Sequence, residues 1–378
     1  MTPARTDVVV VGGGLIGCAL AAELAARGRT VTVVERAEPG AEASGAAAGM
    51  LAPQSEARAR DPFFELAVES RGLYAAWARG LSDETGVDVG YRKTGLLHCR
   101  FDAEVGENAA SPAAPFAWQQ AAGLPVLERR REDLAAEAGG GLSPSVRDAV
   151  FFPDEAAVDP RRLTRAVWLA ALRRGAVVRT GTSVLGFRIE RGACRGVETD
   201  GGPIEADATV DAAGAWAAFE GRLPLPLPVE PVRGQIVELS LAHGPLETIV
   251  ASDDVYLVPR PDGTVLLGST AERVGFHKAV TAEAVSRLIA AATRLVPALG
   301  AARFVTAWSG LRPATPDGLP VLGAGPVQGL FFAAGHFRNG ILLAPVTARI
   351  LADLLTGGPA RDLSPFSIER FAPALQIA

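Results

Sequence analysis

The fold of this chain is indicated by two short stretches, Asp7-Val-Val-Val-Val-Gly12-Gly13-Gly14-Leu15-Ile16-Gly17 and Val31-Thr-Val-Val-Glu35. An apolar strand runs into a glycine turn and a helix, and a second apolar strand then ends in an acid. This order is typical of the βαβ unit that binds an adenine dinucleotide. The glycine spacing alone is a weak signal, but the strand before it and the acid about 20 residues later make the pattern specific.

Each glycine of the motif has its own steric role. Gly12 allows the tight turn, Gly14 lets the backbone approach a pyrophosphate, and Gly17 lets the helix pack close to the strand. The helix N-terminus offers free N–H groups and a positive dipole end to the phosphates. Glu35 is expected to accept hydrogen bonds from a ribose, and a carboxylate there disfavours the extra phosphate of NADP. The alternative is a glycine-rich turn in an unrelated α/β domain.

Composition sets the limits for the rest of the chain. Its 378 residues suffice for two domains or one large interleaved domain, and 48% hydrophobic with 21% charged residues predicts a sizeable core. A formal net charge of −5 gives no indication of a nucleic-acid partner. The three cysteines, Cys18, Cys99 and Cys194, have neither disulfide nor metal-site spacing, so no metal is expected.

A cytoplasmic location is expected. No signal peptide is evident, and the cysteine usage suits a reducing compartment. The uncharged run from Val8 to Ala22 is too short and too rich in glycine for a membrane span, so no integral membrane segment is expected. The Ala-, Pro-, Ser- and Gly-rich stretch Gly106–Pro125 is expected to be a loop or a surface insertion.

Hydrophobic periodicity predicts the elements that follow. Helices are expected over Leu15–Ala26, Phe64–Arg79, from Asp159-Pro160 to about Arg174, Thr281–Leu295 and Ile341–Leu355. Strands are expected over Thr30–Val34, Gly95–Cys99, Ala176–Arg179, Ser183–Arg188, Ala208–Trp216, Gly234–Ser240, Val255–Pro259, Thr264–Gly268 and Gly329–Ala334.

These elements predict an α/β fold in which the nucleotide domain is discontinuous. A Rossmann-type domain is expected at residues 1–90, 150–220 and 310–378. From Arg233 onward the strands are longer and alternate, and a Pro-Asp-Gly turn predicts a hairpin. We therefore expect an inserted substrate domain with an antiparallel sheet at residues 91–149 and 221–309.

The C-terminal region favours a flavin over a nicotinamide. The turn Gly335-His-Phe-Arg-Asn-Gly340 opens directly onto an apolar helix. A helix N-terminus can stabilise the negative charge that develops on a reduced flavin, whereas a nicotinamide becomes neutral on reduction. A nicotinamide-dependent dehydrogenase is the alternative, and the colour of the purified protein would distinguish the two.

Several segments together carry a resemblance to a known family. Besides the glycine motif they are Ser44-Gly-Ala-Ala-Ala-Gly-Met-Leu-Ala-Pro53, Tyr256-Leu-Val-Pro-Arg260, Gly310-Leu-Arg-Pro-Ala-Thr-Pro-Asp-Gly-Leu-Pro320 and Gly335-His-Phe-Arg-Asn-Gly-Ile-Leu-Leu-Ala-Pro345. The chain resembles the D-amino-acid oxidase superfamily of FAD-dependent oxidoreductases, and within it the glycine oxidase family of thiamine biosynthesis. The resemblance spans nearly the whole chain.

The resemblance implies a non-covalently bound FAD, because no cysteine lies in the C-terminal third. The residues expected to bind it are Gly12, Gly14, Leu15, Ile16, Gly17, Glu35, Arg36, Ala43, Ser44, Ala48, Gly49, Met50, Val184, Gly214, His336, Phe337, Arg338, Asn339, Gly340, Ile341 and Leu342.

The resemblance also implies a substrate site. Arg312 and Arg338 would hold an amino-acid substrate, and Tyr256 would reach its carboxylate. A guanidinium suits a carboxylate because it offers a planar fork of two donors. The alternatives are a structural ion pair for Arg312, a backbone carbonyl or Asp317 as the partner of Arg338, and a core position for Tyr256. Ala271 stands where a bulkier side chain is usual, which would widen the pocket.

The implied reaction is oxidative deamination of glycine, sarcosine or small D-amino acids by hydride transfer to flavin N5. Oxygen would be the acceptor, and imine or glyoxylate, ammonia and hydrogen peroxide the products. No acid or base is obligatory: His98, His243 and His277 are expected to be structural or at the surface, and His336 to contact FAD through its backbone.

Three alternatives stay open. One is another reaction of the same superfamily: a D-amino-acid oxidase, a sarcosine-type oxidase, or a dehydrogenase that reduces a quinone. The second is the nicotinamide enzyme, and the third is a non-catalytic flavin-binding protein or assembly subunit. The resemblance also suggests a homo-oligomer.

Overall fold

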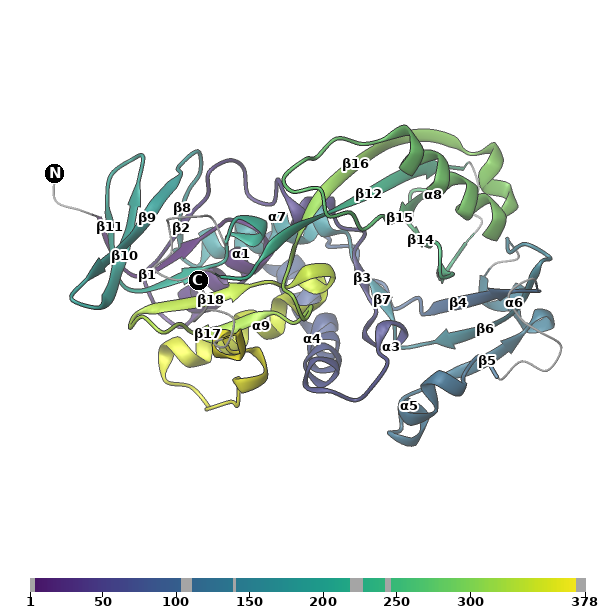
Figure 1. Ribbon diagram of the computed structural model, residues 1–378, viewed down its shortest axis with the longest axis horizontal. Helices are drawn as coiled ribbons and strands as arrows, with labels where there is room; N and C mark the ends of the chain where they lie inside the picture. Colours follow the sequence, from purple (N-terminus) through teal and green to yellow (C-terminus); the bar gives the residue numbers. More distant parts are fainter. Residues whose placement is uncertain (1–3, 103–110, 139–140, 218–226, 242–245, 372–378) are drawn as a thin grey trace.

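Two large sheets form the framework of the molecule. The computed structural model describes residues 4–102, 111–138, 141–217, 227–241 and 246–371. One eight-stranded sheet occupies the left half of the elongated molecule in Figure 1 and the other occupies the right half. We call these the nucleotide half and the substrate half.

The sheet of the nucleotide half is mostly parallel. Its strand order is β17-β18-β11-β1-β2-β8, with β10 and then β9 attached to β11. β17 runs antiparallel to β18, and β10 antiparallel to β11 and β9. The strands are β1 (Ala4–Val11), β2 (Val31–Val34), β8 (Val177–Arg179), β9 (Val184–Glu190), β10 (Ala193–Thr199), β11 (Ile204–Asp211), β17 (Val321–Ala324) and β18 (Leu330–Ala334). The α/β fold class expected from the βαβ pattern is confirmed.

Four helices pack in the core of this half: α1 (Leu15–Ala26), α4 (Pro62–Thr85), α7 (Pro160–Arg173) and α9 (Gly340–Thr356). Helix α1 can start directly behind β1 because Gly17 has no side chain. A Cβ at this position would overlap the carbonyl oxygen of Gly12. Cys18 on this helix is fully buried, and burial raises the pKa of its thiol to about 12.

Helix α9 is a core helix of this half. Within the described ranges, Phe337–Thr356 is the one helical stretch long and apolar enough to cross a membrane, with a mean hydropathy of 1.3. It packs against α1 and α4, and 61% of its most apolar 18-residue segment is buried inside the protein. α4 holds its first turn, since Tyr74 and Ser70 donate hydrogen bonds to the backbone carbonyls of Ile341 and Leu342. Packing within the protein accounts for its apolar composition.

Helix α4 is longer than the periodicity predicts. The side chain of Asp61 accepts a hydrogen bond from the Phe64 N–H at 2.7 Å, which caps the first turn. At the other end, Gly86 adopts a left-handed conformation with φ of 75°, which ends the helix. The expected helix covered only the part in which apolar residues recur.

The sheet of the substrate half has the strand order β16-β12-β15-β14-β13-β4-β6-β5. The strands are β4 (Leu96–Phe101), β5 (Leu127–Arg130), β6 (Val146–Phe152), β12 (Glu230–Ser240), β13 (Ile249–Ala251), β14 (Tyr256–Pro259), β15 (Thr264–Gly268) and β16 (Arg303–Ala314). The expected hairpin is β14–β15. The expected antiparallel sheet is present, with one departure: β13 and β4 pair in parallel. These two strands come from separate segments of the chain, so no hairpin sets their direction.

One long helix packs on this sheet. α8 (Ala282–Leu295) begins at Thr281, whose side chain accepts from the Ala284 N–H, and buries its apolar face in the second core. The shorter helices are α5 (Ala117–Ala121) and α6 (Arg131–Ala138). The stretch Gly106–Pro125 is not irregular throughout, because its described part contains α5 and the 3₁₀ turn η2 (Ala114–Phe116). Residues 106–110 lie outside the described part. The Phe116 ring packs edge-on against Phe152, so this stretch has a core contact of its own.

The small-residue segment after β2 lies between the two halves. It forms the helical turn α2 (Ala43–Ala46) and the strand β3 (Met50–Leu51), which pairs with β7 (Ala156–Ala157). The Trp308 indole N–H donates to the Ala46 carbonyl at 3.0 Å. A Cβ at Gly310 would lie 2.6 Å from the Ala46 Cβ. Small side chains are needed here because β16 passes directly over this backbone.

The domain boundaries remain a prediction. β6 ends at Phe152 and β16 at Ala314, a few residues beyond the expected limits at 150 and 310. In Figure 1 the long strands β12 and β16 extend from the substrate half toward the nucleotide half.

Candidate active site between the two sheets

A cavity of about 390 Å³ lies where the two halves meet. The ends of β1, β2 and β11, the segment from Glu42 to Ala52 and the turn Gly335–Ile341 line it from the nucleotide half. β12, β14 and β16 line it from the substrate half. Almost all residues expected at the site come together here, although they are spread over the chain.

At one end of the cavity the glycine turn is in direct contact with Glu35, the residue that follows β2. The Gly13 N–H donates to Glu35 Oε2 at 2.7 Å, and the Ala37 N–H donates to Oε1 at 2.9 Å. The Leu15 N–H, at the start of α1, donates to Ser44 Oγ at 2.9 Å. Glycine at position 14 leaves the backbone open toward the cavity. The residues at this end therefore fit the adenosine and pyrophosphate of a dinucleotide.

Trp216 is a lining residue that the sequence analysis missed. It ends the 3₁₀ turn η3 (Gly214–Trp216) directly after β11, and its ring lies 3.7 Å below the guanidinium of Arg36. Arg36 also pairs with Glu42 at 2.9 Å. An aromatic residue immediately after a glycine turn at a strand end is a signal that could have indicated it.

The turn before α9 presents its backbone to the cavity. Gly335 and Phe337 both have positive φ, 70° and 46°. The His336 ring is buried, and its Nε2 lies 3.0 Å from Thr347 Oγ1 on α9. Burial lowers the pKa of His336 to about 3, so the imidazole is neutral at physiological pH. With so low a pKa this side chain is too weak a base to take a proton from a substrate.

Arg312, on β16, lines the other end of the cavity. Its Nη1 donates to the Thr270 carbonyl at 2.9 Å and its Nη2 to Ser269 Oγ at 2.7 Å. Burial lowers the pKa of this guanidinium, which still remains a cation at neutral pH, and nearby Tyr256 opposes the shift. Among the described residues no carboxylate lies within ion-pair distance of Arg312, and Glu56 acts on it only from further away. The structural ion pair considered as the alternative is thus absent from the described part of the chain.

Two strand glycines make room for Arg312 and Tyr256. A Cβ at Gly234 on β12 would overlap the guanidinium of Arg312, and a Cβ at Gly268 on β15 would overlap the Tyr256 ring. Tyr256 and Gly268 are direct partners in the β14–β15 ladder. Glycine inside a strand is a signal for such close approach, and it could have indicated both positions.

Arg338 lies at the more exposed side of the cavity. Its Nη2 is 3.5 Å from Glu56 Oε1, at the end of the short helix α3 (Pro53–Glu56). Asp317, considered as its partner, instead pairs with Arg370 at 2.7 Å, so that alternative is wrong. Nothing in the local sequence distinguishes Glu56 from other surface acids.

Three expected residues do not line the cavity. Gly17 acts in packing, as described above, and Leu342 is buried in the core of the nucleotide half. Ala271 is exposed. Its neighbours turn toward β12, where Thr270 Oγ1 accepts from the Gln235 N–H and Glu272 pairs with Arg233, so Ala271 faces outward. It therefore does not set the width of the pocket.

Asp211 is an unexpected titratable group at the cavity wall. It ends β11, it is fully buried, and its Oδ1 accepts from the Ala213 N–H at 2.9 Å. Burial raises its pKa to about 7.

A dinucleotide-binding sheet faces a second sheet across the cavity, and Arg312 provides a cation at the far end. This arrangement is typical of a two-part, dinucleotide-dependent oxidoreductase. The chain belongs to the DAO family of FAD-dependent oxidoreductases, whose sequence profile matches residues 7–354. FAD is the cofactor of this family, and the recognised resemblance is confirmed.

Proteins similar to this chain include a glycine oxidase and a bifunctional ThiO/ThiG protein. The chain is 39% identical over 377 residues to glycine oxidase of Geobacillus kaustophilus, covering 97% of both proteins. Its coordinates superimpose on the crystal structure of glycine oxidase from that organism with a TM-score of 0.91, covering 97% of this chain and 99% of the other. It is also 37% identical to the bifunctional protein ThiO/ThiG of Trichormus variabilis. The match covers 97% of this chain but 55% of that protein, so the chain spans about half the length of the bifunctional relatives.

Proposed function

We propose that this enzyme oxidises the C–N bond of glycine and of similar small amines, such as sarcosine and small D-amino acids. For glycine the balanced reaction consumes oxygen and water and releases glyoxylate, ammonia and hydrogen peroxide. Bound FAD supplies the hydride acceptor. The chain itself supplies a site that holds a small zwitterion in one orientation.

The geometry of Arg312 is the observation that carries this proposal. A cation with neutral protein partners at the wall of a cavity favours an anionic ligand, since an unpaired charge is costly to bury. A carboxylate matches the fork of the guanidinium. The Tyr256 hydroxyl can donate to the same carboxylate, because both side chains line this end of the cavity.

Among the histidines that the structure describes, none is placed to take a proton from the substrate, which supports hydride transfer without an enzymic base. His243 lies outside the described residues. Of the described histidines only His336 lines the cavity, and its ring is bonded to Thr347 and turned toward α9. The amine would therefore enter in its neutral form and lose its proton to water beforehand. Positioning would account for most of the rate enhancement.

The relatives support the choice of substrate class. Those described above are named glycine oxidase or contain a ThiO part. We therefore propose that the product feeds thiamine thiazole synthesis. A cytoplasmic location and a homo-oligomeric state remain predictions.

Anaerobic reduction of the flavin tests the proposal directly. Mixing the yellow holoenzyme without oxygen with glycine, sarcosine or small D-amino acids should bleach the visible flavin absorption, and air should restore it with stoichiometric peroxide. An L-amino acid of similar size serves as the control. Absence of bleaching by every small amine would contradict the proposal, and bleaching without reoxidation by air would indicate a dehydrogenase that uses another acceptor.

A further inference from the structure

A loop of the substrate half lies against the nucleotide half beside the cofactor cavity. The loop Glu272–Val280 connects β15 to α8 and contains neither helix nor strand. Lys278 Nζ pairs with Glu42 Oε2 of the nucleotide half at 2.8 Å. The Ser309 hydroxyl, on β16, donates to the Lys278 carbonyl at 2.5 Å. The loop is thus fastened at Lys278 to both halves.

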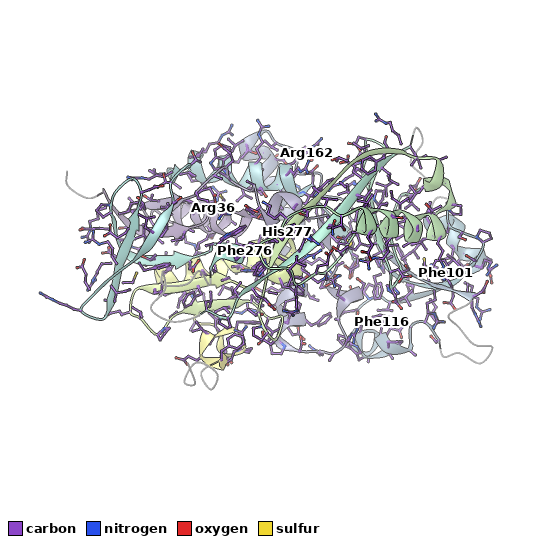
Figure 2. All side chains as sticks on the ribbon, turned by 45° about the horizontal axis from the view of Figure 1, so that its top comes forward. Arg36, Phe101, Phe116, Arg162, Phe276 and His277 are labelled. Atoms are coloured by element: carbon purple, nitrogen blue, oxygen red, sulfur yellow. The ribbon has the colours of Figure 1, made fainter. Side chains whose placement is uncertain are left out.

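Phe276 places an aromatic ring on the same contact. Its centroid lies 5.2 Å from the Trp216 ring at an interplanar angle of 35°. Trp216 in turn lies under the Arg36 guanidinium at 3.7 Å. Figure 2 labels Arg36, Phe276 and His277 near the middle of the long axis. Phe276 is 47% exposed, so a large apolar side chain is kept at the surface where it covers Trp216.

The three residues that the loop contacts or supports all line the cavity. Arg36, Glu42 and Trp216 stand at the end that also contains Glu35 and the glycine turn. Arg36 pairs with Glu42, which also pairs with Lys278. The loop therefore supports from outside a wall that faces the adenosine end of the cofactor site.

We propose that the loop Glu272–Val280 is a clasp for FAD: Phe276 and Lys278 fix the wall formed by Trp216, Arg36 and Glu42, and so slow release of the cofactor. The substrate half thereby contributes to cofactor retention although its residues form no part of the glycine motif. The inference depends on FAD use, which the family establishes, and not on the identity of the amine.

The test measures FAD binding in the absence of any amine. FAD is removed from the wild type and from Phe276→Ala, and the apoproteins are titrated with FAD while flavin fluorescence is followed. We expect the Kd of Phe276→Ala to rise about two- to tenfold, with a faster release on dilution. The matched control is Phe304→Ala, since Phe304 is 51% exposed and does not line the cavity. Its Kd should equal that of the wild type.

Lys278→Ala gives a second, independent readout. Release of FAD from the wild type should accelerate with ionic strength, because salt screens the exposed pair between Lys278 and Glu42. The variant should release FAD faster at low salt and show a weaker salt dependence. Phe276→Leu covers the case in which the alanine variant does not fold, and an intermediate Kd is expected for it.

Unchanged Kd and release rates in both loop variants would overturn the proposal. A lower melting temperature of the Phe276→Ala apoprotein with an unchanged Kd would also overturn it, because that result describes a purely structural contact. Since no amine is present, failure of the clasp is distinguishable from failure of the proposed amine oxidation.

Discussion

Arg312 shows how a single residue gains its role from its neighbours. The Thr270 carbonyl and Ser269 Oγ hold its guanidinium from one side, and neither neutralises it. Arg312 and Ser269 both line the cavity. A side chain anchored by neutral acceptors keeps its charge for a ligand, whereas one in an internal ion pair would not.

Truncation of Arg312 should separate substrate binding from cofactor binding. Arg312→Ala is expected to weaken apparent binding of the amino acid by about 2–5 kcal/mol, because the carboxylate loses its charged partner. FAD content should stay at the wild-type level. Arg312→Lys should recover part of the loss, since it restores the charge but not the fork. Anaerobic titration of flavin reduction measures the effect, and unchanged substrate affinity in Arg312→Ala would remove this residue from the site.

A side chain at position 234 should also weaken substrate binding, because it would displace Arg312. Gly234→Ala places a methyl group where the Arg312 guanidinium lies, so the arginine must move. We expect KM for the amine to rise at least tenfold, an effect of about 1.4 kcal/mol or more. Gly80→Ala on α4 is the control, because a Cβ there meets nothing within 4 Å. Equal KM values in the two variants would show that the close packing of Gly234 against Arg312 does not affect substrate binding.

At the scale of elements, a buried acid holds the short helix α3. Glu155 is fully buried, and its Oε1 accepts from the N–H groups of Gln54 and Ser55 at 2.7 and 3.1 Å. Among the described residues its Oε2 has no hydrogen-bond partner. Burial raises the pKa of Glu155 to about 8, against the partial compensation from Arg71. α3 ends at Glu56, the ion-pair partner of Arg338. Glu155 therefore supports the helix that positions this partner.

Stability should therefore fall as pH rises. A carboxyl with a raised pKa in the native state binds more protons there than in the unfolded chain, so the free energy of unfolding decreases from about pH 4.5 to pH 8. One such group contributes about 1.4 kcal/mol per pH unit in this window. Asp211, with a pKa of about 7, acts in the same direction. Urea unfolding at pH 5, 6, 7 and 8 measures the slope.

Glu155→Gln should make that slope shallower, because the amide cannot ionise. Glu38→Gln, at an exposed position, serves as the control and should leave the slope unchanged. The same slope in wild type and Glu155→Gln would show that Glu155 does not titrate in this range.

At the scale of the molecule, the cofactor cavity depends on both sheets. The nucleotide half provides the glycine turn, Glu35 and the turn before α9, and the substrate half provides β12, β14 and β16. Neither half encloses the cavity alone. A ligand that fills it should therefore stabilise the arrangement of the two halves as well as each half.

FAD should raise the thermal stability of the whole chain with the logarithm of its free concentration above Kd. A ligand that binds only the native state contributes about 2.7 kcal/mol at a free concentration of 100 times Kd. The melting temperature of the apoprotein should rise steadily as FAD is added, and limited proteolysis should slow in parallel. AMP, which lacks the flavin, should stabilise less. A melting temperature that does not depend on FAD would contradict a cavity completed by both halves.

The sequence by itself determined the parts of this protein that depend on local periodicity. The apolar run to Val11, the glycine turn and Glu35 indicated a βαβ unit, and Asp159-Pro160 marked the start of α7. These signals are local because strand alternation, helix caps and glycine turns act over a few residues. The family motifs extended the prediction to FAD and to Arg312.

Only the tertiary structure decided which distant side chains meet. It paired Arg338 with Glu56 and placed Trp216 at the cavity, and it turned Ala271 outward. These residues lie in turns, short helices and a loop, and the packing of the two halves brings them together. Such contacts join segments far apart in the chain, so no short stretch of sequence encodes them.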